Sequence, residues 1–199
     1  MTDGGGFVLG IDIGGSKVAL ATSGVGDPRR RLRERTIPTR ADEGAAQVLT
    51  RILATARAIA DDTAAAYGGR LVAVGAVSPG IVGEDSILLA PNNPGWDRLA
   101  LPSSLRDGLG VPTVVVGNDV KAAALAEARW GALAGAPTGI FLNLGTGVAV
   151  AVVVDGAVLS GAHGAAGEIA YNLHTPGDAG FASGRAPMEE LASGSALAA

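Results

Sequence analysis

The chain has 199 residues, a net charge of −4, a hydrophobic fraction of 48% and no cysteine. The lack of cysteine excludes a disulfide scaffold and any Cys-ligated zinc, and the acidic balance argues against binding to nucleic acid. Neither an apolar run of about 18 residues nor a signal peptide is found in the sequence, so we expect a cytoplasmic protein with no membrane partner.

The first part of the sequence alternates apolar runs with glycine-rich turns, which is typical of a sheet with crossover helices. Buried strands are predicted at Phe7–Ile13, Val18–Ala21, Leu71–Val77 and Thr113–Val116, and a short strand at Ser86–Ala90. Helices are predicted at Ala41–Tyr67 and Leu101–Leu109. The basic stretch Arg29–Arg35 is interpreted as a solvated strand or hairpin tip.

The second part starts with a predicted helix over Asp119–Leu133, followed by a hairpin of Gly139–Leu144 and Val148–Val154. Beyond Gly161 we expect loops, with a helix from Pro187. Hairpins mixed with strand–helix crossovers indicate the α/β class with mixed sheets flanked by helices. A change of unit is expected near residue 117, which gives an N-terminal lobe of residues 1–117 and a C-terminal part of residues 118–199.

Two glycine-rich turns are candidate phosphate loops, because paired glycines let backbone N–H groups approach an anion without interference from Cβ atoms. The first turn comprises Asp12, Ile13, Gly14, Gly15, Ser16 and Lys17, and the second comprises Gly145, Thr146 and Gly147. In the first turn, Asp12 could hold a hydrated Mg²⁺. Each turn could equally be a plain hairpin connection; the presence of one in each half favours the functional interpretation.

Polar residues that could clamp a polyol occur at three further places. Asn118 and Asp119 lie at a strand end that opens a helix, where Asp119 is either an N-cap or a base facing the ligand crevice of an open α/β sheet. Glu168 and Tyr171 stand in a glycine-lined loop, and Glu189 starts a predicted helix, where acidic residues are expected in any case.

Several motifs occur in an order that resembles the ROK family of bacterial sugar kinases and sugar-responsive repressors. They are Asp12–Lys17, Pro79–Val82, Pro91–Trp96, Gly117–Ala124, Leu144–Gly147 and Gly167–Ile169. The resemblance implies an actin-like ATPase (ribonuclease H-like) fold whose two lobes close on ATP and a hexose, and it also allows a homodimer. It implies that Asp119 is the catalytic base, that Gly80, Asn118, Glu168 and Glu189 contact the sugar, and that the two turns bind phosphates.

The sequence departs from the family pattern in the region that carries a structural zinc in other members. Tyr171 stands where the family has a zinc-binding histidine, and residues 180–189 match the family's cysteine segment with every cysteine replaced. We therefore expect no zinc site. The loop is expected either to be held by packing, for example of Phe181 and Pro187, or to be mobile, and Tyr171 is expected to contact the sugar.

Family members continue well beyond the position that matches Ala199, so the second lobe is expected to be incomplete and the 199 residues alone to lack kinase activity. The favoured function is ATP-dependent phosphorylation of a hexose, with glucose first. The alternatives are a sugar-binding regulator of the ROK type and a non-catalytic sugar-binding protein; a repressor's DNA-binding domain does not fit into the few residues before Phe7.

Overall fold

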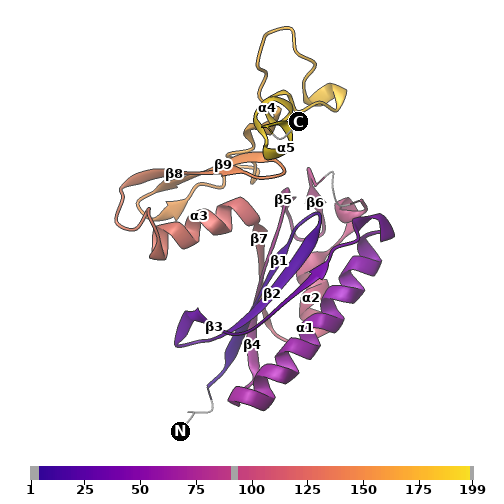
Figure 1. The fold of residues 1–199 in the computed structure, drawn as a ribbon, viewed down its shortest axis with the longest axis vertical. Helices are drawn as coiled ribbons and strands as arrows, with labels where there is room; N and C mark the ends of the chain where they lie inside the picture. Colours follow the sequence, from indigo (N-terminus) through magenta and orange to yellow (C-terminus); the bar gives the residue numbers. More distant parts are fainter. Residues whose placement is uncertain (1–4, 91–93, 198–199) are drawn as a thin grey trace. The chain divides into compact units, whose positions relative to one another are not determined.

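The computed structural model describes residues 5–90 and 94–197, and contacts divide the chain into two units, Met1–Asp119 and Val120–Ala199 (Figure 1). We call them unit 1 and unit 2 and describe each by itself. Residues 91–93 of the Pro91–Trp96 motif lie outside the described residues.

The main sheet of unit 1 mixes antiparallel and parallel strands in the order β3-β2-β1-β4-β7. Its strands are β1 (Phe7–Ile13), β2 (Lys17–Gly24), β3 (Asp27–Pro38), β4 (Leu71–Ser78) and β7 (Thr113–Asn118). β1 to β3 form an antiparallel meander, whereas β4 and β7 join parallel to β1 through helical crossovers. The α/β class and the mixed sheet predicted from the sequence are confirmed.

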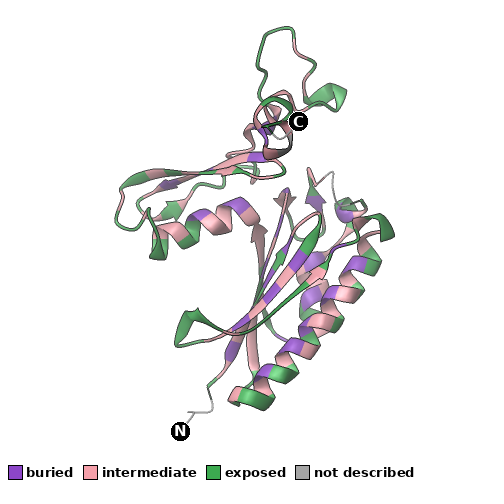
Figure 2. Cartoon of the chain, viewed as in Figure 1, coloured by how far each residue is buried: buried purple, intermediate pink, exposed green. Residues whose placement is uncertain are grey.

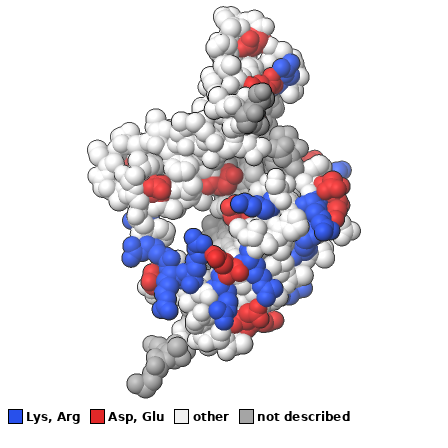
Figure 3. Space-filling view, viewed as in Figure 1, with Lys and Arg blue, Asp and Glu red and all other residues white. Residues whose placement is uncertain are grey.

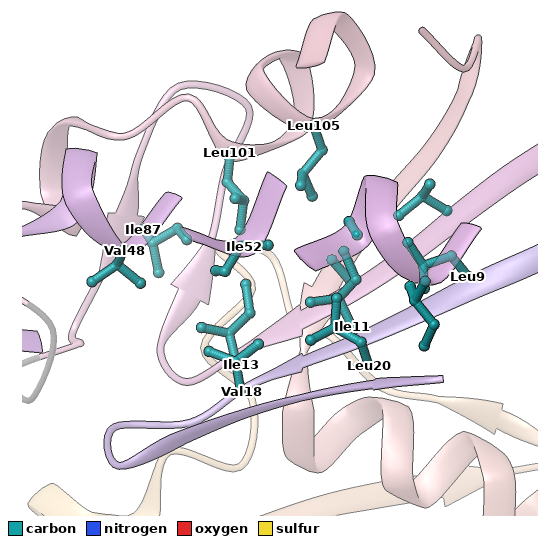
Figure 4. Close-up of a cluster of buried hydrophobic side chains, with 14 of the residues drawn as sticks. Leu9, Ile11, Ile13, Val18, Leu20, Val48, Ile52, Ile87, Leu101 and Leu105 are labelled. Atoms are coloured by element: carbon teal, nitrogen blue, oxygen red, sulfur yellow. The ribbon is translucent and has the colours of Figure 1, made fainter. Parts of the chain in front are cut away.

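Helices α1 (Ala45–Tyr67) and α2 (Leu101–Leu109) cover one face of this sheet (Figures 1 and 2). Along β1 every second side chain points into the core that they close, while the intervening ones, including Asp12, point to the opposite face. Figure 4 shows side chains of β1 and β2 pointing toward those of α1 and α2. Fully buried members of this core include Leu9, Ile13, Leu20, Ile52, Leu101 and Leu105.

Unit 2 is built on a smaller sheet in the order β10-β9-β8. Its strands β8 (Thr138–Leu144), β9 (Val148–Val154) and β10 (Ala157–Val158) are antiparallel. Helix α3 (Asp119–Trp130) starts at the last residue of unit 1, and its Val120 and Ala124 pack with Ala151 and Val153 of β9. The 3-10 turns η3 (Ile169–Tyr171) and η4 (Phe181–Ser183) and the short helices α4 (Pro187–Ala192) and α5 (Gly194–Leu197) follow.

Some predicted boundaries were wrong, each for a local reason. The helix predicted from Ala41 is a 3-10 turn, η1 (Ala41–Glu43), followed by α1, because Gly44 at φ 87° interrupts the helical backbone. The helix predicted to reach Leu133 ends at Trp130, since the Glu127 side chain accepts a hydrogen bond from the Ala132 backbone N–H and turns the chain. The short strand predicted at Ser86–Ala90 is present as β6 (Ile87–Leu88), which is shorter than predicted because it pairs over only two residues with β5 (Ile81–Val82).

The arginine-rich segment forms the exposed edge strand β3, as predicted, and Figure 3 shows Lys and Arg side chains gathered over it. Its arginines attach the strand to α1: Arg33 lies over the Tyr67 ring, 5.0 Å from its centroid, and Arg35 pairs with Asp62 at 2.5 Å. Among the helices of the described residues, none combines the length and apolar character that crossing a bilayer requires.

Candidate functional site

The first glycine-rich turn joins β1 to β2 and is fixed by backbone contacts. The Gly14 N–H donates to the Lys17 carbonyl at 2.9 Å, which closes the turn. Thr39 holds it from outside: its hydroxyl donates to the Gly14 carbonyl at 2.6 Å and its N–H to the Ser16 carbonyl at 3.0 Å. The Thr39 side chain is fully buried, whereas Ser16 and Lys17 are exposed. Sequence analysis missed Thr39, because a threonine after a strand carries no recognisable signal.

Asp12 lies just before this turn, on the sheet face opposite the core, where it borders a hollow of about 420 Å³. Its side chain is accessible, but the surrounding protein removes part of its hydration. This desolvation raises the pKa of Asp12 above its usual value, the negative charge of Asp119 raises it further, and the positive charge of Lys17 lowers it. Asp12, Lys17 and Asp119 therefore form one interacting charge cluster within unit 1.

Asn118 and Gly80 come together at the carboxyl ends of two neighbouring parallel strands. The register pairs Ser78 of β4 with Asn118 of β7, and the Asn118 side-chain amide donates to the Gly80 carbonyl at 3.0 Å. Gly80 has φ 88°, and a Cβ there would collide with the Leu88 carbonyl, so only glycine suits this position. The carboxyl edge of an open α/β sheet is where ligands bind, and Asp119 follows at the first position of α3.

The second glycine-rich turn lies in unit 2 between β8 and β9 and is closed by a hydrogen bond of 3.0 Å from the Gly145 N–H to the Gly147 carbonyl. The Val148 N–H, directly after the turn, donates to the Glu189 carboxylate at 3.1 Å. The Gly194 N–H donates to the Gly145 carbonyl at 2.8 Å. The structure thus brings Glu189, predicted as a sugar contact, against the second predicted phosphate loop.

Glu168 and Tyr171 lie on a loop held against β9 at Gly167. The Gly167 carbonyl accepts the Val150 N–H at 3.0 Å, and Gly167 has φ 90°. Burial raises the pKa of the Tyr171 phenol, and the charges of Glu189 and then Glu168 raise it further. At neutral pH Tyr171 therefore keeps its proton and can donate a hydrogen bond next to two carboxylates, which is the chemistry expected of a polyol clamp.

A further lysine contact supports the same loop. The Lys121 ammonium, on the first turn of α3, donates to the Gly164 carbonyl. In the sequence, Lys121 is one of two lysines in the chain and lies within the Gly117–Ala124 motif. Nothing in its spacing indicated a contact more than forty residues away.

The residues of unit 1 fit a magnesium ion better than an all-protein metal cage. Mg²⁺ usually keeps several waters and takes one or two carboxylates together with substrate phosphates. Asp12 interacts with the charge of Asp119, and a cation would relieve the repulsion that raises the Asp12 pKa. Within residues 5–90 and 94–197, no three His, Cys, Asp or Glu side chains gather as a metal site.

The residues at the position of the family's structural zinc do not fit that metal. Tyr171 packs edge-to-face on Phe181, with ring centroids 5.1 Å apart and planes at 83°, so an aromatic pair stands where the resemblance places a histidine and thiolates. Asp178 closes the loop between them by accepting the Thr175 hydroxyl and the N–H groups of Thr175 and His174, each at 2.7 Å. These hydrogen bonds lower the pKa of Asp178 below its usual range.

Comparison with known proteins gives consistent matches. The model of the ROK family matches residues 8–199. A glucokinase of Halalkalibacterium halodurans is 31% identical over 171 residues, which cover 83% of this chain and 49% of the relative. An N-acetylmannosamine kinase of Shigella flexneri is 34% identical over 197 residues, which cover 96% of this chain and 63% of the relative.

Among solved structures, a ROK family glucokinase from Streptomyces griseus in complex with glucose and AMPPNP is 30% identical with a TM-score of 0.76, covering 96% of this chain and 59% of that one. The structural likeness confirms the actin-like ATPase fold. The chain spans about half the length of the glucokinases it matches and less than two thirds of the N-acetylmannosamine kinases.

Proposed function

Since the chain belongs to the ROK family, we propose that it carries the catalytic residues of an ATP-dependent hexose kinase, with glucose as the first candidate substrate. The observation that carries the proposal is the charge cluster of unit 1. Asp119 stands at the start of α3, next to Asn118 at the carboxyl edge of the sheet, and its charge acts on Asp12 beside Lys17. Relatives named glucokinase and N-acetylmannosamine kinase support the same class of reaction.

In this proposal, unit 1 supplies the base and the first phosphate loop. Asp119 accepts the proton of the attacking sugar hydroxyl, which makes the oxygen a better nucleophile toward the γ-phosphorus of ATP. Asn118 and Gly80 position the sugar, and their mutual hydrogen bond fixes the loop after β4. The backbone of Gly14 and Gly15, with Ser16 and the Lys17 ammonium, binds phosphate oxygens.

Unit 2 supplies the second phosphate loop and the remaining sugar contacts. The turn of Gly145, Thr146 and Gly147 presents backbone N–H groups to phosphate oxygens, while Glu168 and Glu189 accept hydrogen bonds from sugar hydroxyls. Tyr171 donates one to the sugar, because its raised pKa keeps the phenol protonated. A Mg²⁺ ion held through water by Asp12 would neutralise charge on the transferred phosphoryl group.

A non-catalytic sugar-binding protein is the second candidate, favoured by the missing zinc ligands around Tyr171. Decay of catalysis would remove the pressure to keep a base and a phosphate-binding lysine, yet Asp119 and Lys17 are both present and both act electrostatically on Asp12. The kinase therefore accounts for more of the site than a bare sugar binder does.

Calorimetric titration separates these functions. The product of the complete gene is titrated with glucose, mannose and N-acetylmannosamine, with and without AMPPNP and Mg²⁺. A kinase binds nucleotide and hexose together, whereas a bare sugar binder does not respond to nucleotide. A coupled assay then measures turnover of the product of the complete gene. There Asp119→Asn is expected to lower turnover by roughly 10²–10⁴ with little change in hexose affinity, and near wild-type turnover would remove Asp119 from the role of base.

A further inference from the structure

The second glycine-rich turn is held at both ends by the segment that carries Glu189. At one end the Val148 N–H donates to Glu189 Oε2 at 3.1 Å. At the other, the Gly194 N–H donates to the Gly145 carbonyl at 2.8 Å. Glu189 is the third residue of α4, and Gly194 begins α5, so the eight residues of 187–194 bracket the turn.

The contacts between this segment and the turn leave little space. A Cβ on Gly194 would lie 2.7 Å from the Gly145 carbonyl oxygen, which is a backbone atom, so this position requires glycine. A Cβ on Gly147 would lie 2.6 Å from Glu189 Oε2 and would displace the carboxylate from its place against the turn. Neither glycine has a φ in the left-handed region, so both effects arise from the approach of the carboxylate and the α5 backbone to the turn. This proximity indicates that the position of Glu189 and the conformation of the turn depend on each other.

Only one of the two oxygens of the Glu189 carboxylate accepts a hydrogen bond from the described part of the chain. Within the described part of the chain, Oε2 receives the Val148 N–H and Oε1 has no hydrogen-bond partner. Glu189 also lies close enough to Tyr171 for its charge to act on the phenol. One oxygen therefore holds the turn while the other remains for a ligand hydroxyl.

We propose that Glu189 is a positioning residue that couples the hexose to the second phosphate loop: a sugar hydroxyl bound at Oε1 fixes the carboxylate, and Oε2 in turn fixes the backbone of Gly147 and Val148 for phosphate. This inference rests on the proposed function. By linkage, a hexose that orders the turn strengthens nucleotide binding, and nucleotide strengthens hexose binding by the same factor.

The first test is amide hydrogen exchange at Val148 in the unliganded chain, which requires no activity. Glu189→Ala removes the acceptor and is expected to speed this exchange about tenfold, as for loss of a hydrogen bond to a charged group. Glu189→Gln keeps an acceptor oxygen and is expected to restore most of the protection. Glu190→Ala is the matched control, because Glu190 is on the same helix but pairs with Arg185, and it is expected to leave Val148 unchanged.

The second test measures coupling by calorimetry with glucose and AMPPNP–Mg²⁺ as probes. In the unmutated product of the complete gene, saturating glucose is expected to tighten AMPPNP binding about fivefold or more and to slow Val148 exchange further. In Glu189→Ala the coupling factor is expected to fall to about one, even at glucose concentrations raised to restore saturation.

The outcomes separate this inference from the kinase proposal. Unchanged Val148 exchange in Glu189→Ala, or an equal effect of Glu190→Ala, overturns the positioning role whatever the protein's function. Coupling that survives in Glu189→Ala overturns the link between the two ligands while leaving the kinase proposal intact. A product of the complete gene that binds neither hexose nor nucleotide contradicts the proposed function and the coupling together, although the Val148 result would still report how the turn is held.

Discussion

Replacing Gly167 by alanine tests how the loop that carries Glu168 is held against β9. Gly167 has φ 90°, and a Cβ at this position would collide with the Val150 carbonyl. A non-glycine residue in such a backbone conformation costs on the order of 1–3 kcal/mol. Relief of the collision requires the loop to move, which breaks the 3.0 Å hydrogen bond from the Val150 N–H to the Gly167 carbonyl and costs about 1 kcal/mol more.

Gly167→Ala is therefore expected to destabilise unit 2 by about 2–4 kcal/mol, a sum of the strain and hydrogen-bond terms. For a unit of this size, each kcal/mol corresponds to roughly 4–8 °C in Tm, so we expect a drop of at least about 8 °C. The assay is thermal unfolding followed by circular dichroism, with hydrogen exchange at the β9 amides to locate the loss.

Other glycines of unit 2 provide matched controls that separate strain from collision. Gly156 has φ 75° but open space around its Cβ position, so Gly156→Ala is expected to show only the conformational cost. Gly177 has neither a left-handed φ nor a neighbour within 4 Å, and its substitution should be nearly neutral. A Gly167→Ala protein with the same Tm as Gly177→Ala would refute the reasoning. A Gly167→Ala protein with the same Tm as Gly156→Ala would show that the collision is avoided without cost.

Further outcomes follow from the same geometry. Phe181→Ala removes an edge-to-face contact of about 0.5–1.5 kcal/mol and should therefore speed tryptic cleavage after Arg185. EDTA should leave cleavage of the wild type unchanged, and acceleration by EDTA would indicate a bound metal. Asp119→Asn should lower the pKa of Asp12 in a carboxyl NMR titration, because a negative charge that raises it is removed. The folded-state pKa of Asp12 is raised, so the contribution of Asp12 to stability is present at low pH and is lost as pH rises above about 3.8 through the folded-state pKa. Asp12→Asn should abolish this part of the pH dependence of stability. A stability profile that does not change in Asp12→Asn would contradict this prediction.

The elements with strong local signals could be predicted from the sequence. The signal for each of these elements lies in residues that follow one another in the chain. They are the alternating burial along β1, the long periodic stretch of α1, and the glycine turns at 14–15 and 145–147. The predicted helix boundaries were wrong where a single residue determines the start or end of the helix. The positive φ of Gly44 and the side-chain hydrogen bond of Glu127 leave no signal in the hydrophobic periodicity.

The candidate residues of the site could be named from the sequence, whereas the contacts among them could not. Motif order marks Asn118, Gly80 and Glu189, yet no spacing indicates that Asn118 holds the Gly80 carbonyl or that Glu189 holds the Val148 amide. Those bonds join residues 38 and 41 positions apart and depend on strand register and on where α4 packs. Thr39 was missed for the same reason, since its function in the fold is visible only once the turn at Gly14 is in place.

The aromatic pair of Tyr171 and Phe181 has a consequence for the conditions under which the loop between these two residues stays folded. A loop closed by thiolates opens when they are oxidised or when the cell is starved of the metal. In a chain without a single cysteine, two packed rings do not respond to peroxide or to metal scarcity. This loop would keep its shape through oxidative stress, and its folding would not depend on the supply of zinc.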